Sequence, residues 1–242
     1  MSPDRLKALA AGPGLLLIEG AMGLFDGAGL AGRGATADLS RLLGLPVVLI
    51  VDAARMAQSV APLVEGFARH DSEVGIAGVI LNRVGSRRHT AMLRAALAPS
   101  GLPVLGAVPR QPDLALPDRH LGLVQASEHP DLSGFLDRAA DASTSHSDLD
   151  ALAALASPLP AHPQPPPTLS PLGNRIAVAR DAAFAFAYAH MLDAWHAAGA
   201  SLHPFSPLSG QPVVPEVAAV LLTGGYPELH AGEQAARREV WD

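Results

Sequence analysis

Cysteine is absent from all 242 residues of the sequence. Disulfides, cysteine-ligated zinc and thiol nucleophiles are therefore excluded within this chain. The sequence also has no apolar run near the roughly 20 residues that cross a bilayer. Its first residues, MSPDRLKALAAGPG, lack the basic and long apolar regions of a signal peptide. We therefore expect a cytoplasmic protein with no membrane partner.

Charged residues are few as well. They make up 17% of the chain, the net charge is −6, and no long basic run occurs, so a nucleic-acid partner is not expected. The histidines are scattered: His190 and His196 are not spaced to share one helical face, and no metal-site spacing occurs. Hydrophobic residues make up 49% of the chain, enough to bury one or two cores.

Short, continuous apolar runs recur through the first half of the chain. Because they do not alternate with polar residues, they are typical of strands buried on both faces, as in a parallel sheet covered by helices. Their starts are roughly 30 residues apart, which fits βαβ units. The predicted strands are 15–19 (LLLIE), 47–52 (VVLIVD), 76–82 (IAGVILN) and 103–108 (PVLGAV).

The segments between these runs have helical patterns. Thr36 is a candidate N-cap for a helix that ends before Gly44. Residues 56–70 place apolar side chains on one helical face, and Pro62 predicts a late start or a kink there. Ser86 is a candidate N-cap for a helix over 87–98.

Proline divides the chain into two parts. The segment 139–172 contains SPLPAHPQPPPTLSP and predicts a semi-rigid linker, with a short helix at 147–156 before the prolines. A second α/β pattern follows. Its predicted elements are a strand at 175–180, a helix at 182–198 capped by Asp181 and ended by Gly199, and strands at 200–205 and 217–222. The predicted domains are therefore 1–138 and 173–242.

Polar residues follow the predicted strands, where open parallel sheets bind ligands. Glu19 and Asp52 could hold Mg²⁺ or be ordinary strand-end acids, and Asp38 could serve in the same way or stabilise a helix start. Asn82 could bind the edge of a purine base or form a turn. Arg83 is one of several arginines that could bind phosphates or carboxylates or form a solvated basic face; the others are Arg87, Arg88, Arg110 and Arg119.

A glycine pair follows the last predicted strand. The backbone N–H groups of Gly224 and Gly225 could bind an oxyanion, or the pair could simply form a turn.

Taken together, these stretches resemble the cobyrinic acid a,c-diamide synthases, which amidate a corrinoid in cobalamin synthesis. The resemblance covers nearly the whole chain, and its most specific parts are EGAMGLFDG and PDRHLGL. The motifs that carry it, in order, are IEGAMGLFDG, ATADLSRLLGLPVVLIVDA, GVILNRVGS, LPVLGAVPR, PDRHLGL, RIAVARDAAFAFAY and GGYPEL.

The resemblance implies a fold and an activity. The first domain is expected to be an α/β P-loop NTPase domain similar to dethiobiotin synthetase, and the last domain a partial class I glutamine amidotransferase domain. The reaction would amidate the a and c carboxylates of cobyrinate or hydrogenobyrinate. ATP with Mg²⁺ would convert each carboxylate into an acyl phosphate, and ammonia from glutamine would displace the phosphate.

The same resemblance implies roles for individual residues. Glu19 would be a Mg²⁺ ligand, while Asn82 and Arg83 with Pro109 and Arg110 would bind the nucleotide. Gly224 and Gly225 would shape the oxyanion site of the glutaminase. The candidate contacts to the corrinoid are Asp118, Arg119 and His120.

The sequence also departs from the pattern of this family. No GxxxxGK[ST] spacing is present, and the family's nucleophilic cysteine and later His–Glu pair are absent. We therefore expect an incomplete chain that alone neither hydrolyses glutamine nor binds ATP tightly. An exposed sheet edge would favour self-association, with a homodimer as the candidate state. The alternatives are a cobyric acid synthase, a partitioning-type ATPase and a non-catalytic remnant.

Overall fold

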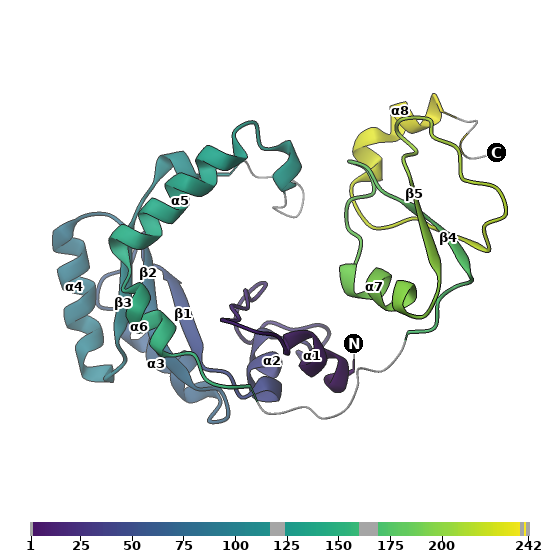
Figure 1. The fold of residues 1–242 in the computed structure, drawn as a ribbon. Helices are drawn as coiled ribbons and strands as arrows, with labels where there is room; N and C mark the ends of the chain where they lie inside the picture. The colour runs from purple at the N-terminus through teal and green to yellow at the C-terminus, as the bar shows by residue number, and fades with distance from the viewer. Residues whose placement is uncertain (1, 117–123, 160–168, 238–239, 241–242) are drawn as a thin grey trace. The chain divides into compact units, whose positions relative to one another are not determined.

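The computed structural model describes residues 2–116, 124–159, 169–237 and 240. The chain forms two compact units, one of Ala10–His162 and one of Met1–Leu9 with Pro163–Asp242. We call them the larger and the smaller unit and describe each by itself (Figure 1). Among the described residues, no helix has the length and hydropathy to cross a membrane.

The larger unit contains a parallel sheet with the strand order β1-β2-β3. Its strands are β1 (Val47–Asp52), β2 (Ile76–Val84) and β3 (Val104–Pro109). Its helices are α2 (Thr36–Leu43), α3 (Val60–His70), α4 (Arg87–Leu97), α5 (Leu132–His146) and α6 (Leu149–Ala154), and its 3₁₀ turns are Ala98–Ser100, Pro112–Leu114 and Ala126–Glu128. The predictions of these three strands, and of a parallel sheet, are confirmed.

The core of this unit lies between the sheet and two helices. Val60 and Val64 of α3, with Leu93 and Leu97 of α4, pack against buried strand residues such as Leu81. Burying a side chain of this size stabilises the fold by about 1.5–3 kcal/mol. The helices α5 and α6 contact β3, and the turn between them pairs with it, since the Asp148 N–H donates to the Leu105 carbonyl at 2.8 Å.

Helix boundaries in the larger unit follow local capping chemistry. Ser86 caps α4 as predicted, because its hydroxyl accepts from the His89 N–H. Gly44 ends α2 in the left-handed conformation that glycine favours. The prediction that Thr36 caps α2 is wrong: the N-cap is Ala35, and Thr36 is the first helical residue. The helix α3 starts late, at Val60, as Pro62 predicted.

The prediction of a strand at 15–19 is wrong, because these residues are neither helix nor strand. A strand needs a partner for its backbone groups. The segment 15–19 pairs with no strand of the described structure, and Leu17 is 91% exposed.

The smaller unit contains a second parallel sheet, with the order β5-β4-β6. Its elements are α1 (Pro3–Ala10), β4 (Arg175–Ala179), α7 (Ala189–Ala197), β5 (Ser201–Phe205), β6 (Ala219–Leu221), a 3₁₀ turn (Pro227–His230) and α8 (Ala231–Ala235). The boundary between the units falls after Leu9, so the last residue of α1, Ala10, is assigned to the larger unit. Buried Trp195 of α7 packs with Ile176 and Val178 of β4.

Two helical predictions need correction. Asp181 does not cap a helix at 182, because α7 begins only at Ala189, with Tyr188 as its N-cap. The segment 139–172 is not linker from its start, because α5 continues to His146. The short helix predicted at 147–156 is present as α6.

Candidate functional site

The carboxyl ends of β1, β2 and β3 bring the predicted nucleotide-binding residues together. Because the strands are parallel, their last residues meet at one edge of the sheet. Asp52 pairs in register with Asn82, and Val84 pairs with Pro109. The Arg110 N–H then donates to the Val84 carbonyl at 3.1 Å, which places Asn82, Arg83, Pro109 and Arg110 within one edge.

An ion pair joins the ends of β1 and β2. Arg83 Nε donates to Asp52 Oδ1 at 2.8 Å, and the Arg83 NH2 group donates to Asp52 Oδ2. The hydrogen bond from Arg83 holds the pKa of Asp52 below its usual range, and the backbone N–H of Ala54 adds to this effect. The same pairing raises the pKa of Arg83. The Arg83 guanidinium is thus bound to Asp52.

The backbone of Arg83 has φ = +57°, the left-handed region that few non-glycine residues adopt. The Arg83 N–H donates to Asn82 Oδ1 at 2.9 Å, and the Asn82 carbonyl accepts from the Ala53 N–H at 2.9 Å. The side-chain oxygen of Asn82 is therefore held in place. The Asn82 amide NH₂ donates to no described residue and remains available to a ligand.

The loop after β2 is fixed by His89. The His89 Nδ1 atom accepts from the Gly85 N–H at 3.1 Å, which leaves a proton on Nε2 to donate to the Met56 carbonyl at 2.6 Å. This side chain ties α4 to the loop that precedes α3. Sequence reasoning did not assign it this role.

A cavity of about 740 Å³ lies beside β3. It is bounded by Ser86 and Arg87 at the start of α4, by Pro109 at the end of β3, and by Ser147 and Asp148 between α5 and α6. The cavity therefore reaches the same sheet edge as the predicted nucleotide residues.

The predicted metal ligand, Glu19, lies in the irregular segment before α2 and is exposed. No group of three or more potential ligands that could hold a metal ion is present among the described residues. The role of Glu19 therefore stays a prediction that rests on the resemblance. The predicted corrinoid contacts Asp118, Arg119 and His120 lie outside the described residues.

In the smaller unit, the glycine pair lies against the segment that follows β4. The Gly224 carbonyl accepts from the Phe186 N–H at 2.8 Å. A Cβ atom on Gly225 would lie 2.1 Å from the Ala183 carbonyl oxygen, so this position requires glycine. The Thr223 hydroxyl lies 2.8 Å from the Phe184 carbonyl oxygen, to which it donates. The oxyanion role of the pair stays a prediction.

Asp181 fixes this segment, a role that the sequence analysis missed. Its Oδ1 atom accepts from the N–H groups of Ala183 (2.9 Å) and Phe184 (3.2 Å). Its Oδ2 atom accepts from the Ser206 hydroxyl and the Leu208 N–H, both at 2.9 Å. The first pair is typical of an aspartate turn, which the sequence could have indicated. The second pair comes from the loop after β5.

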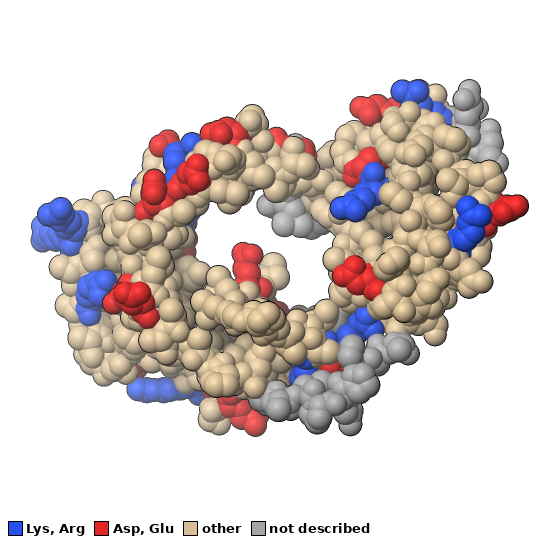
Figure 2. All heavy atoms as spheres, viewed as in Figure 1, with Lys and Arg blue, Asp and Glu red and all other residues tan. Residues whose placement is uncertain are grey.

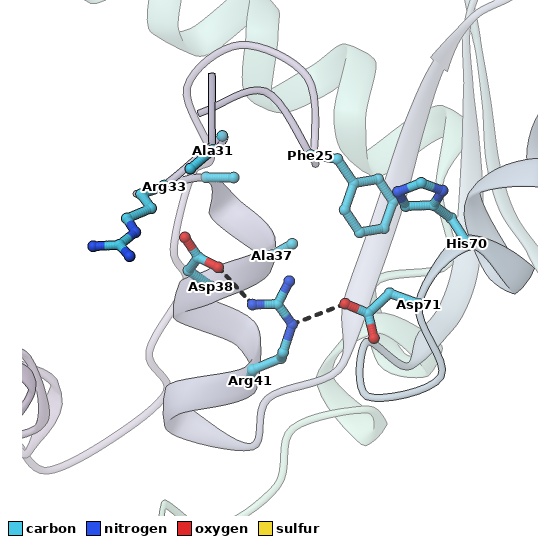
Figure 3. Close-up of a pocket in the computed structure, with 10 residues that line it drawn as sticks. Phe25, Ala31, Arg33, Ala37, Asp38, Arg41, His70 and Asp71 are labelled. Carbon is cyan, nitrogen blue, oxygen red and sulfur yellow. Dashed lines mark hydrogen bonds and ion pairs between the residues drawn. The ribbon is translucent and has the colours of Figure 1, made fainter. Parts of the chain in front are cut away.

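A second cavity, of about 240 Å³, lies beside α2 in the larger unit. Figure 3 shows Phe25 and His70 on one side of it and Asp38 and Arg41 on the other. Asp38 lies near the start of α2, but it also accepts from the Gly34 N–H at 2.6 Å and pairs with Arg41. Sequence reasoning named Asp38 as a candidate ligand or helix-start carboxylate but predicted no cavity here. Over the face drawn in Figure 2, acidic and basic side chains are interspersed.

Comparison with known proteins gives the following similarities. Residues 1–118 match a family model described as an AAA domain. Three relatives named hydrogenobyrinate a,c-diamide synthase come from Brucella anthropi (54% identical), Rhizobium meliloti (53%) and Rhodobacter capsulatus (51%). The alignments cover 96–98% of this chain but only 54–55% of those relatives. The chain thus spans about 55% of the length of the curated relatives it matches. No solved structure matches it.

Proposed function

We infer that this chain belongs to the hydrogenobyrinate a,c-diamide synthase family and takes part in amidating the a and c carboxylates of a cobyrinate-type corrinoid. Identities of 49–54% over nearly the whole chain support this proposal. Because the chain spans about 55% of these relatives, the activity of the whole enzyme is proposed here, together with its substrates: the corrinoid, ATP and glutamine.

The proposed chemistry follows from the poor reactivity of a carboxylate. A carboxylate oxygen of the corrinoid attacks the γ-phosphorus of ATP, ADP leaves, and a mixed acyl phosphate forms. Ammonia derived from glutamine then attacks the acyl carbon, phosphate leaves, and a proton lost from nitrogen yields the amide. Positive groups that offset charge on the transferring phosphoryl group would accelerate the first step.

The observation that carries the nucleotide proposal is the convergence of Asn82, Pro109 and Arg110 at one sheet edge. Ligands of open parallel sheets bind at such an edge. We propose that the amide NH₂ of Asn82, which donates to no described residue, donates to the adenine base of ATP. Pro109 would pack against the base, and Arg110 would approach the phosphates. Because Arg83 is bound to Asp52, we propose that it acts by holding the ends of β1 and β2 together.

Mg²⁺ would accompany ATP and supply electrostatic stabilisation of the phosphates. A nucleotide-bound Mg²⁺ keeps several waters and needs only one or two protein carboxylates. Glu19, an exposed carboxylate without a partner in the described structure, fits that modest requirement.

For the smaller unit we propose the beginning of a glutaminase fold, in which the Gly224–Gly225 backbone would face the oxyanion. The parallel sheet and the packed glycine pair support this proposal. Since the chain contains no cysteine, we propose that it does not hydrolyse glutamine by itself.

The nucleotide proposal can be tested by titrating the ¹⁵N-labelled chain with Mg·ATP and following backbone amide resonances by NMR. We expect weak binding that shifts the resonances of residues 82–86 and 107–110. Asn82→Ala should weaken the binding, whereas Asn174→Ala, an exposed asparagine in the smaller unit, should not. Shifts confined to other parts of the chain would contradict the proposed site.

A further inference from the structure

The 240 Å³ cavity beside α2 has a composition suited to a small polar group. Its lining combines the ring of Phe25 and the methyl groups of Ala35 and Ala37 with four charged side chains, Arg33, Asp38, Arg41 and Asp71. The Phe25 ring packs against Phe67, with ring centroids 5.9 Å apart, and against His70, which also lines the cavity, at 4.5 Å. One wall is therefore built of packed rings, and the other carries charged side chains.

Arg41 is fixed between two carboxylates. Its Nε atom donates to Asp71 Oδ2 at 2.9 Å, and its NH1 group donates to Asp38 Oδ1 at 2.5 Å. In Figure 3 the remaining NH2 group points into the space between Ala37 and Phe25. No described residue accepts a hydrogen bond from that group. An oriented donor that is not used within the protein is suited to a ligand carbonyl.

The two carboxylates also keep acceptor capacity. Each oxygen of Asp38 and Asp71 accepts one hydrogen bond from Gly34, Arg41 or Glu73, and a carboxylate oxygen can accept two. The hydrogen bond from Arg41 is the main cause that lowers the pKa of Asp38. The Glu73 N–H, followed by Arg41, lowers the pKa of Asp71. Both side chains are therefore ionised at neutral pH.

The charges of this group decide what the cavity accepts. Asp38, Asp71 and Arg41, which are hydrogen-bonded to one another, carry a net charge of −1 and so disfavour an anion. The Arg33 guanidinium also lines the cavity, but it lies on the far side of Asp38 from Arg41 in the view of Figure 3. A neutral group that accepts from Arg41 and donates to an aspartate is complementary to the cavity, and a primary carboxamide has both functions.

We propose that the cavity formed by Phe25, Ala37, Asp38, Arg41 and Asp71 binds a primary carboxamide and discriminates against the corresponding carboxylate. The carbonyl oxygen accepts from the Arg41 NH2 group, and the amide NH₂ donates to Asp38 or Asp71. If the proposed function holds, on which this link rests, the carboxamide is an amidated side chain of the corrinoid or the side chain of glutamine.

The test compares propionamide with propionate, which have the same shape but differ in charge. The ¹⁵N-labelled full chain is titrated with each at constant ionic strength, and the amide resonances of Gly32, Ala35 and Ala37 are followed by NMR. For so small a ligand we expect millimolar affinity for propionamide. Propionate should bind about fivefold more weakly, the factor for two unit charges about 4 Å apart in water.

Matched variants separate recognition from folding. Arg41→Gln should abolish the saturable shifts, whereas Arg69→Gln, which removes an arginine that is 80% exposed on α3, should not. Asp71→Asn removes the net charge of the Asp38–Arg41–Asp71 group and should bring the affinities for propionamide and propionate close together. Asp131→Asn, which neutralises an aspartate in the same unit, should leave the preference for propionamide unchanged. The comparison of Asp71→Asn with Asp131→Asn tests the proposal even if Arg41→Gln does not fold.

Equal binding of both probes, or shifts confined to residues outside the cavity, would overturn the proposal. Neither result would bear on the nucleotide site, because the probes contain no nucleotide.

Titration with the a,c-diamide corrinoid and with glutamine identifies the source of the amide. Shifts of the same three resonances by either compound would support the proposal, whereas shifts by neither would overturn its link to the reaction.

Discussion

Replacing Asp181 by alanine should destabilise the smaller unit, because this one carboxylate accepts four hydrogen bonds. Two come from Ala183 and Phe184 in its own turn, and two come from Ser206 and Leu208 beyond β5. A hydrogen bond contributes about 1 kcal/mol net, and more when the acceptor is charged. The site is only partly buried, so water would replace some of these bonds, and we expect a loss of about 3 kcal/mol.

Asp181→Asn should cost less, about 1–2 kcal/mol, because its oxygen can still accept from Ala183 and Phe184 while its amide NH₂ cannot accept from the Leu208 N–H. Asp193→Ala removes an exposed aspartate of α7 in the same unit and should change stability by no more than about 0.5 kcal/mol.

The assay is urea unfolding followed by tryptophan fluorescence. Trp195 is 5% exposed and packs on β4, so it reports on the smaller unit even if the two units unfold separately. If Asp181→Ala lost less than about 0.5 kcal/mol, similar to Asp193→Ala, the argument that Asp181 fixes the turn would be refuted.

The other predictions concern the glycine pair, the sheet edge and the missing cysteine. Gly225→Ala should lower the melting temperature, because its Cβ would lie 2.1 Å from a backbone oxygen, whereas Gly232→Ala, where no atom lies within 4 Å, should not. The pKa of Asp52 is lowered in the fold, so its contribution to stability is present above the ordinary pKa, about 3.9, and is lost as pH falls through the lower folded value. Urea midpoints measured from neutral to acidic pH should fall less steeply for Asp52→Asn, and an unchanged slope would contradict this. Purified chain should release no glutamate from glutamine above background; clear release would refute the expected need for a cysteine.

The sheet of the larger unit was predictable because each of its strands is encoded by a local apolar run. The runs at 47–52, 76–82 and 103–108 are continuous and apolar, and they form β1, β2 and β3. The run at 15–19 is also short, continuous and apolar but forms no strand, because pairing depends on a neighbouring strand that composition does not reveal.

The sheet edge was predictable in outline, and its side-chain pairing was not. Parallel strands bring their ends together, so Asn82 and Pro109 could be expected at one edge. The pairing of Arg83 with Asp52 occurs together with a left-handed backbone conformation at Arg83. The sequence indicates neither of these features. The hydrogen bonds of Asp181 to Ser206 and Leu208 were not predictable either, because these partners are distant from it in the chain.

The most direct test of the proposed function is an amidation assay on a chimera. The matching segment of the Brucella anthropi relative, which is 54% identical, would be replaced by this chain, and hydrogenobyrinate would be supplied with ATP, Mg²⁺ and glutamine. The account predicts conversion of two carboxylates to amides, detected by mass spectrometry, and loss of this activity on Asn82→Ala but not on Asn174→Ala. A folded chimera that binds hydrogenobyrinate and ATP but forms no amide would contradict it.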